Sequence, residues 1–404
     1  MFKKLLIFIT INLIILSGIY VGVILTKQYD NISINNLEKE EDRLVINIAE
    51  NNIIKEKIEE KVAPKEIFSE YYEKAEKLME CMTIEEKVGQ MFLARYPEKG
   101  VINEIEEHNP GGYVLFGRDF EGKTPETMLD ELEENQSVSK INLILGVDEE
   151  GGTVVRVSNQ KAFRNTKFLS PQQLWNEGGL QAILEDSKEK SKLLKSIGLN
   201  MNLAPVVDIP KDKTSFIYKR SYGRGIEKTA IYAEKIIETM NDSNMISVMK
   251  HFPGYGDNVD THTGIAIDNR SYQTFKDEDF IPFEKGIKAG APCILVNHNI
   301  VKCLDKEKPA SLSSNVIKIL REELNFSGII MTDDLAMDAV KSYVENGEAA
   351  VQAVLAGNDI IISSDFVKQK NEILLAVKKG TISEKIINKA VRRILAFKYA
   401  YEII

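Results

Sequence analysis

Eight short apolar segments, separated by stretches with helical periodicity, constrain the fold of this chain more than any other feature. They span residues 91–93, 112–116, 142–147, 201–207, 246–249, 293–296, 328–331 and 359–362. Strands that alternate with helices form parallel βαβ units, and eight such units in one domain form a barrel. An open doubly wound sheet is the alternative, but no glycine-rich phosphate-binding motif follows the first segment. The sequence therefore predicts an α/β fold with a single (β/α)8 TIM-type barrel.

Polar side chains follow nearly every apolar segment. They are Arg95, Arg118 with Asp119, Asp148 with Glu149, Asp208, Lys250 with His251, Asn297 with His298, Asp333 with Asp334, and Ser363 with Ser364. A single polar residue in such a position is more often a helix cap or a satisfied core group. Barrel enzymes assemble their active sites from the carboxyl ends of the strands, so eight together predict a functional site.

The amino-terminal region differs from the rest of the chain. Residues 5–25 are almost wholly apolar and follow Lys3 and Lys4. About 20 apolar residues suffice to cross a bilayer, and the lysines favour a cytoplasmic amino terminus. We therefore predict a transmembrane signal anchor over 1–27, a charged stalk over 28–68 and a catalytic barrel over 69–404, attached to the cell membrane with the barrel extracytoplasmic. A cleaved signal peptide, which would give a secreted protein, is the alternative.

The overall charge bears on the kind of partner. The chain of 404 residues carries a formal net charge of -9 at pH 7, and phosphate backbones attract basic surfaces. Nucleic acid is therefore not an expected partner.

For the oligomeric state, we expect a monomer.

The densest group of ionisable residues lies in the loop 250–262, after the fifth apolar segment. It includes Asp260 and His262, and Asp333 follows the seventh segment. A carboxylate facing an imidazole can displace a group at an acetal carbon, because the carboxylate attacks while the imidazole protonates the leaving oxygen. Helix capping by the acids is a simpler explanation. A metal site that includes His251 is less favoured, because the loop has neither His-x-His nor His-Glu-x-x-His spacing.

Five motifs, in order, resemble those of a known enzyme family. They are MTIEEKVGQMF at 82–92, VDEEGG at 147–152, LAPVVD at 203–208, KHFPG at 250–254 and MTDDLAM at 331–337. Together they resemble the β-N-acetylglucosaminidase branch of glycoside hydrolase family 3. The resemblance covers about residues 70–404.

The resemblance implies roles for individual residues. Asp333 is similar to the family's catalytic nucleophile, His262 to its acid/base histidine, and Asp260 to the histidine's partner in a dyad. The residues that resemble the family's N-acetylglucosamine-binding groups are Asp148, Arg156, Arg220, Lys250 and His251. No metal and no cofactor is implied.

The function implied is that of a retaining exo-β-N-acetylglucosaminidase acting on peptidoglycan fragments such as muropeptides. A neutral imidazole repels an anionic acceptor less than a carboxylate does, so phosphorolysis is an alternative to hydrolysis. A related β-glucosidase or β-xylosidase is another alternative. A catalytically silent protein that binds cell-wall glycan is the alternative from a different class.

Four departures from the family pattern qualify the resemblance. Tyr255 stands where the family often has a second loop histidine, and Thr261 replaces the commoner serine inside the dyad. The interval 256–260 is one residue shorter than in many members. The chain also ends soon after the helical region 386–399, so the second domain of many members is not expected, which favours the loop histidine as the acid.

Overall fold

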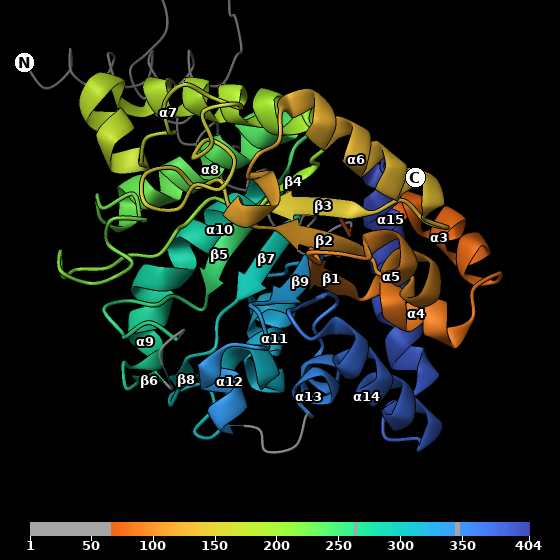
Figure 1. Cartoon of the computed structure of the whole chain (residues 1–404). Helices are drawn as coiled ribbons and strands as arrows, with labels where there is room; N and C mark the ends of the chain where they lie inside the picture. The colour runs from red at the N-terminus through yellow and green to blue at the C-terminus, as the bar shows by residue number, and fades with distance from the viewer. Residues whose placement is uncertain (1–65, 262–263, 265, 344–347) are drawn as a thin grey trace, which may run out of the picture. The chain divides into compact units, whose positions relative to one another are not determined.

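The computed structural model describes residues 66–404 except 262–263, 265 and 344–347. Eight strands form one parallel sheet in the order β10-β1-β2-β3-β4-β5-β7-β9 (Figure 1). A bridge between Met331 and Ile360 links the two end strands, so the sheet forms a nearly closed barrel. The predicted eight-stranded barrel is confirmed. Its strands are β1 (Phe92–Arg95), β2 (Gly112–Leu115), β3 (Ile144–Val147), β4 (Met201–Asn202), β5 (Ile246–Phe252), β7 (Cys293–Val296), β9 (Ile329–Thr332) and β10 (Ile361–Ser363).

Helices surround the barrel on its outer side (Figure 1). They are α3 (Tyr72–Met79), α4 (Ile84–Gln90), α5 (Val101–His108), α6 (Pro125–Val138), α7 (Pro171–Ser196), α8 (Ile226–Asp242), α9 (Tyr272–Thr274), α10 (Phe280–Lys288), α11 (Ser314–Lys318), α12 (Asp338–Tyr343), α13 (Ala349–Ala356), α14 (Phe366–Lys378) and α15 (Glu384–Ala400). A two-stranded pair, β6 (Ile267–Asp268) with β8 (Ile300–Val301), lies outside the barrel sheet. Side chains of Thr83 and Ser170 cap α4 and α7 by accepting backbone N–H groups, as reciprocal capping boxes.

The barrel strands are buried on both faces. Every residue of β2, β3, β5, β7 and β9 is buried, because helices cover the outside and side chains fill the inside. This burial explains why the strands appear in the sequence as continuous apolar runs. The fourth strand is shorter than the predicted run 201–207. Pro205, which has no backbone N–H to donate, interrupts the run, and pairing with β5 resumes as a bridge between Val206 and Lys250.

One part of the predicted fold class is wrong. Within residues 66–404 and outside the gaps noted above, no helix has the length and apolar character needed to cross a membrane. The segment predicted as a transmembrane helix, residues 1–27, lies outside the described residues, as does nearly all of the predicted stalk 28–68. We correct the fold class to the barrel, which is the part of the predicted class that the described residues show. The extracytoplasmic location stays a prediction.

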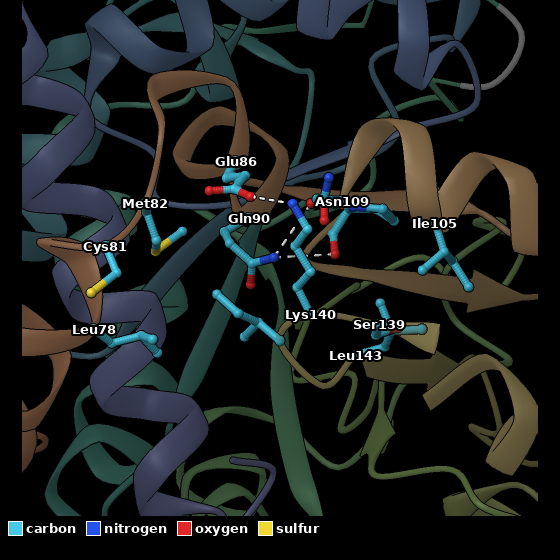
Figure 2. Close-up of a pocket in the computed structure, with 12 residues that line it drawn as sticks. Leu78, Cys81, Met82, Glu86, Gln90, Ile105, Asn109, Ser139, Lys140 and Leu143 are labelled. Atoms are coloured by element: carbon cyan, nitrogen blue, oxygen red, sulfur yellow. Dashed lines mark hydrogen bonds and ion pairs between the residues drawn. The ribbon is translucent and has the colours of Figure 1, made fainter. Parts of the chain in front are cut away.

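A small pocket of about 140 Å³ lies near the amino-terminal ends of β1, β2 and β3 (Figure 2). Gln90 lines it and donates from Nε2 to the backbone carbonyls of Asn109 and Pro110, each at 3.3 Å. Beneath it, the ammonium of Lys398 on α15 donates to Gln90 Oε1 and to the carbonyl of Asn142, both at 2.7 Å. Lys398 is fully buried, and burial lowers its pKa to about 7. These two oxygens take the place of the acid that usually pairs with a buried ammonium group.

The pKa of Lys398 predicts a pH dependence of stability. Between about pH 7 and its unfolded pKa near 10.4, the unfolded chain binds more protons at this residue than the folded chain. Stability therefore rises with pH across this window and is lowest below about pH 7. Relative to Lys398→Met, the wild-type free energy of unfolding should gain up to about 1.4 kcal/mol per pH unit there. Urea unfolding from pH 6 to 10 measures the difference. Exposed Lys379→Met should give a constant difference, and a constant difference for Lys398→Met would contradict the prediction.

Candidate active site

A cavity of about 340 Å³ lies at the carboxyl ends of the barrel strands, at the end opposite the pocket of Figure 2. Residues in or directly after all eight strands line it. They are Arg95, Val114 with Phe116, Asp148, Leu203, Lys250 with His251, Leu295, Asp333 with Asp334, and Ile362, joined by Val154, Arg156, Arg220 and Met337 from other loops and segments. The cavity thus gathers the polar groups that the sequence places after its apolar segments.

Strand β5 contributes two adjacent residues to the cavity. In a regular strand, neighbouring side chains point to opposite faces. Here the pairing of β5 with β7 shifts register between Met249 and Phe252, and such irregularities redirect side chains next to active sites. Lys250 and His251 lie within this shift, and both line the cavity.

A buried charge cluster forms one side of the site. Lys250 Nζ lies 2.6 Å from Asp148 Oδ1 and 2.7 Å from Glu150 Oε1. Arg220 donates two parallel hydrogen bonds to Glu150, from Nε to Oε2 at 2.9 Å and from Nη2 to Oε1 at 2.7 Å. Burial raises the pKa of Glu150, but Arg220 and Lys250 outweigh burial and hold that pKa well below its usual range. The carboxylate is therefore ionised, and it fixes both cations in place.

His251 is oriented from both of its ring nitrogens. Nε2 lies 3.2 Å from Arg220 Nη2, and Nδ1 lies 2.7 Å from Asp208 Oδ2. A guanidinium has only donors, so Nε2 accepts and the Nδ1 proton is donated to Asp208. The same carboxylate accepts the backbone N–H of Tyr255 at 2.8 Å. Asp208 therefore holds both the imidazole and the start of the following loop.

The segment after β3 positions Arg156 through a buried acid. Glu149 accepts the backbone N–H groups of Arg156 at 2.7 Å, Val157 at 2.8 Å and Ser158 at 3.3 Å. Glu149 is fully buried, and these amides replace the water that a buried carboxylate loses. Its role is to shape the loop.

Two guanidinium groups face the ring of Phe116 in the cavity wall. The guanidinium carbon of Arg95 lies 4.5 Å from the ring centroid, and that of Arg156 lies 5.9 Å from it. Each Nε is buried without a hydrogen-bond partner. No ion pair within the described part of the chain involves either side chain. The wall therefore carries positive charge that no acid in that part neutralises through an ion pair.

The two acids that follow β9 have different environments. Asp334 accepts the backbone N–H groups of Ala336 at 2.9 Å and Ser364 at 3.0 Å, and it also accepts the Ser364 hydroxyl. Asp334 is thus occupied in joining the β9 and β10 loops. Asp333 lines the cavity and accepts the N–H of Asp334 at 2.9 Å. Both acids line the cavity, and the structural role suits Asp334.

The predicted site residues are brought together in part. Asp333 and all five predicted sugar-binding residues line one cavity. His262 lies outside the described residues, and Asp260 is described but is not among the cavity-lining residues. Sequence reasoning missed the roles of Glu150, Asp208 and Arg95. The signal for all three was their position one to three residues beyond an apolar segment.

The comparisons with known proteins agree with this geometry. Residues 83–397 match the model of the glycosyl hydrolase family 3 N-terminal domain. The chain belongs to glycosyl hydrolase family 3. A "Beta-hexosaminidase" of Nitrosomonas eutropha is 30% identical over 66% of this chain and 77% of its own length. The predicted family, its β-N-acetylglucosaminidase branch and the enzyme class, a glycoside hydrolase of the β-N-acetylhexosaminidase type, are confirmed.

Solved structures of this family are also similar. A family 3 beta-N-acetylglucosaminidase from Paenibacillus has a TM-score of 0.75 and 30% identity, over 80% of this chain and 63% of that one. A Beta-N-acetylhexosaminidase from Beutenbergia cavernae has a TM-score of 0.70 and 24% identity, over 79% of this chain and 99% of that one. At that identity the second likeness shows the fold alone.

The charge cluster predicts a strong effect of Glu150→Gln. An amide keeps the shape but lacks the charge that holds Lys250 and Arg220, so two buried cations are left with one acid, Asp148. We expect kcat/KM to fall by at least about 100-fold, since truncating a buried pair costs several kcal/mol. Steady-state kinetics on a chromogenic glycoside measures it. Glu189→Gln, at an exposed ion pair with Arg164, is the control and should change little. Equal activity of the two variants would contradict the assigned role.

Proposed function

We propose that this family 3 enzyme is a retaining exo-β-N-acetylglucosaminidase that removes terminal N-acetylglucosamine from peptidoglycan fragments. The observation that carries the proposal is the shared cavity. It places Asp333 among the five residues, Asp148, Arg156, Arg220, Lys250 and His251, that resemble the family's sugar-binding groups. The names of the relatives in the β-hexosaminidase branch support the choice of sugar.

The proposed reaction has two displacements. The Asp333 carboxylate attacks the anomeric carbon, the bond to the leaving oxygen breaks, and His262 gives that oxygen a proton. A water molecule then attacks the same carbon and gives its proton to the neutral imidazole. The bond to Asp333 breaks, and the sugar leaves with its original anomeric configuration. Asp260, two residues before the histidine, would accept a hydrogen bond from the other ring N–H and stabilise the charged form.

The buried cluster supports binding of a neutral, hydroxyl-rich sugar. Glu150 holds Lys250 and Arg220, and Lys250 in turn holds Asp148, before any ligand arrives. Binding therefore costs little ordering entropy. Charged donors and acceptors held in this way form strong hydrogen bonds to sugar hydroxyls. A preorganised site of this kind also stabilises the charge that develops in the transition state better than bulk water does.

The cationic wall supports an anionic aglycone. The guanidinium groups of Arg95 and Arg156 lie on Phe116, and neither is paired with an acid among the described residues. In peptidoglycan fragments that have lost their stem peptide, the sugar beside N-acetylglucosamine carries a free lactyl carboxylate, which a guanidinium binds well. Chitin fragments carry no such group. This difference favours the peptidoglycan fragment over the chitin fragment.

The sugar specificity is tested with 4-nitrophenyl β-glycosides. We expect hydrolysis of the N-acetylglucosaminide at least about 100-fold faster, in kcat/KM, than of the glucoside or xyloside. Asp333→Ala should lower this rate by at least about 100-fold, and His262→Ala should do so on the phenyl N-acetylglucosaminide, whose leaving oxygen needs the acid. Comparable rates on the glucoside would favour a β-glucosidase, and acceleration by phosphate with release of a sugar phosphate would favour a phosphorylase. Equal inactivity of wild type and variants would favour a glycan-binding protein.

The aglycone preference is tested with Arg95→Met. Methionine keeps the contact with Phe116 but removes the charge. For N-acetylglucosaminyl-N-acetylmuramic acid we expect kcat/KM to fall by about tenfold or more, as expected for one charge-assisted hydrogen bond. For chitobiose, which has no carboxylate, the change should stay within about twofold. Arg164→Met is the control, and equal losses on both disaccharides would contradict an anionic subsite.

A further inference from the structure

The two unusual residues of the loop after β5 contact each other. The hydroxyl of Tyr255 and Oγ1 of Thr261 are 2.6 Å apart. Tyr255 is 2% exposed and Thr261 is fully buried. Both positions depart from the family pattern, and Thr261 lies between Asp260 and His262 in the sequence. A hydrogen bond inside a buried setting is favourable and well directed. It therefore joins the first turn of the loop to the dyad segment.

The body of Tyr255 is fixed by the sugar-binding half of the site. Its ring packs edge-on against His251, with ring centroids 5.1 Å apart, and edge-on against Phe216, also at 5.1 Å. Its backbone N–H donates to Asp208 at 2.8 Å. Asp208 is the same acid that orients His251. The phenol thus extends from a rigid base toward Thr261.

The residues on either side of Tyr255 must be glycines because of a buried ion pair beneath them. Arg270 donates to Asp279 Oδ2 at 2.8 Å and to the carbonyl of Gly254 at 3.0 Å. A Cβ on Gly254 would lie 2.1 Å from Asp279 Oδ1, and one on Gly256 would lie 2.7 Å from the guanidinium carbon of Arg270. Both glycines also have positive φ, at 121° and 54°. The backbone that carries Tyr255 therefore rests directly on this pair.

The electrostatic setting keeps the phenol protonated. Burial, together with the negative charges of Asp333, Asp208 and Asp260, raises the pKa of Tyr255 well above its ordinary value. A protonated phenol can exchange a hydrogen bond with a hydroxyl without adding charge to the site. The charges that act on it include Asp333 and Asp260, the two acids assigned to the reaction.

From these contacts we infer that Tyr255 and Thr261 are a pair of positioning residues that fix the chain segment on which the acid/base dyad stands. The inference rests on the proposed function, because it takes Asp260 and His262 as the dyad. Asp208 and the Arg270–Asp279 pair set the position of the phenol, and the phenol sets the position of Thr261. The two family departures then act as one unit, in which each hydroxyl needs the other.

Leaving-group dependence tests the inference. A phenyl N-acetylglucosaminide needs the acid to leave, whereas a 4-nitrophenyl N-acetylglucosaminide leaves with little help. For Tyr255→Phe and for Thr261→Val we expect kcat/KM on the phenyl substrate to fall by about tenfold, a partial loss of general-acid catalysis. On the 4-nitrophenyl substrate the fall should stay below about threefold. Thr261→Ser keeps the hydroxyl and should recover most of the phenyl activity that Thr261→Val loses.

Two further variants separate positioning from stability. Tyr113→Phe removes another buried tyrosine hydroxyl, which donates to Glu104 at 3.0 Å, and it should affect both substrates equally. The double variant Tyr255→Phe with Thr261→Val should be no slower than either single variant, because both remove the same bond. Thermal unfolding establishes that each variant is folded, and Thr261→Val alone carries the test if Tyr255→Phe does not fold.

The outcomes distinguish this inference from the proposed function. If the wild-type enzyme hydrolyses neither aryl N-acetylglucosaminide, the proposed function fails. If it hydrolyses both, but the variants slow the two substrates equally or the double variant loses the product of the single effects, the positioning role is overturned. Selective loss on the phenyl substrate with non-additive effects supports it.

Discussion

The carboxylate of Glu150 is the interaction on which the site depends. It forms an ion pair with Lys250 of β5 and accepts two hydrogen bonds from Arg220. Its backbone carbonyl accepts Lys190 of α7 at 3.2 Å. One buried residue thus joins the end of β3, strand β5, helix α7 and the loop that carries Arg220. A charge buried this deeply is tolerated only when all its partners are in place, so the fold of this face and the geometry of its cations are set together.

The site has two halves with different supports. The sugar-binding half stands on the barrel itself, because Lys250 and His251 belong to a strand and Asp148 follows one directly. The proton-transferring half stands on a loop, which by itself would hold a side chain loosely. Asp208 links the two, since one of its oxygens bonds the ring of His251 and the other the N–H of Tyr255. Through Asp208, the rigid sugar-binding half therefore also fixes Tyr255 in the first turn of the loop.

The sequence predicts the barrel well because its strands are buried on both faces, so each is a short apolar run that ends at a polar group. It predicts β4 too long, because residues 201–207 are mostly apolar, whereas the regular pairing ends at Asn202 and Pro205 has no N–H to continue it. The role of Glu150 cannot be read from the sequence, because Arg220 meets it across 70 residues of chain. Likewise Asp208 and His251 are 43 residues apart. Arg220 itself is predicted only through family resemblance.

The departures at Tyr255 and Thr261 show why single positions are poor guides to function in such a loop. Against a family pattern, each change taken alone weakens the assignment of Asp260 and His262. In three dimensions the two hydroxyls bond to each other at 2.6 Å. A histidine at position 255 is shorter than tyrosine, so it would not place a polar atom where the phenol hydroxyl meets Thr261. The larger ring also fills an apolar pocket formed by Val206, Ile217 and Phe216. The two changes are therefore consistent with one loop geometry, in which the longer tyrosine side chain reaches Thr261 and packs against apolar residues.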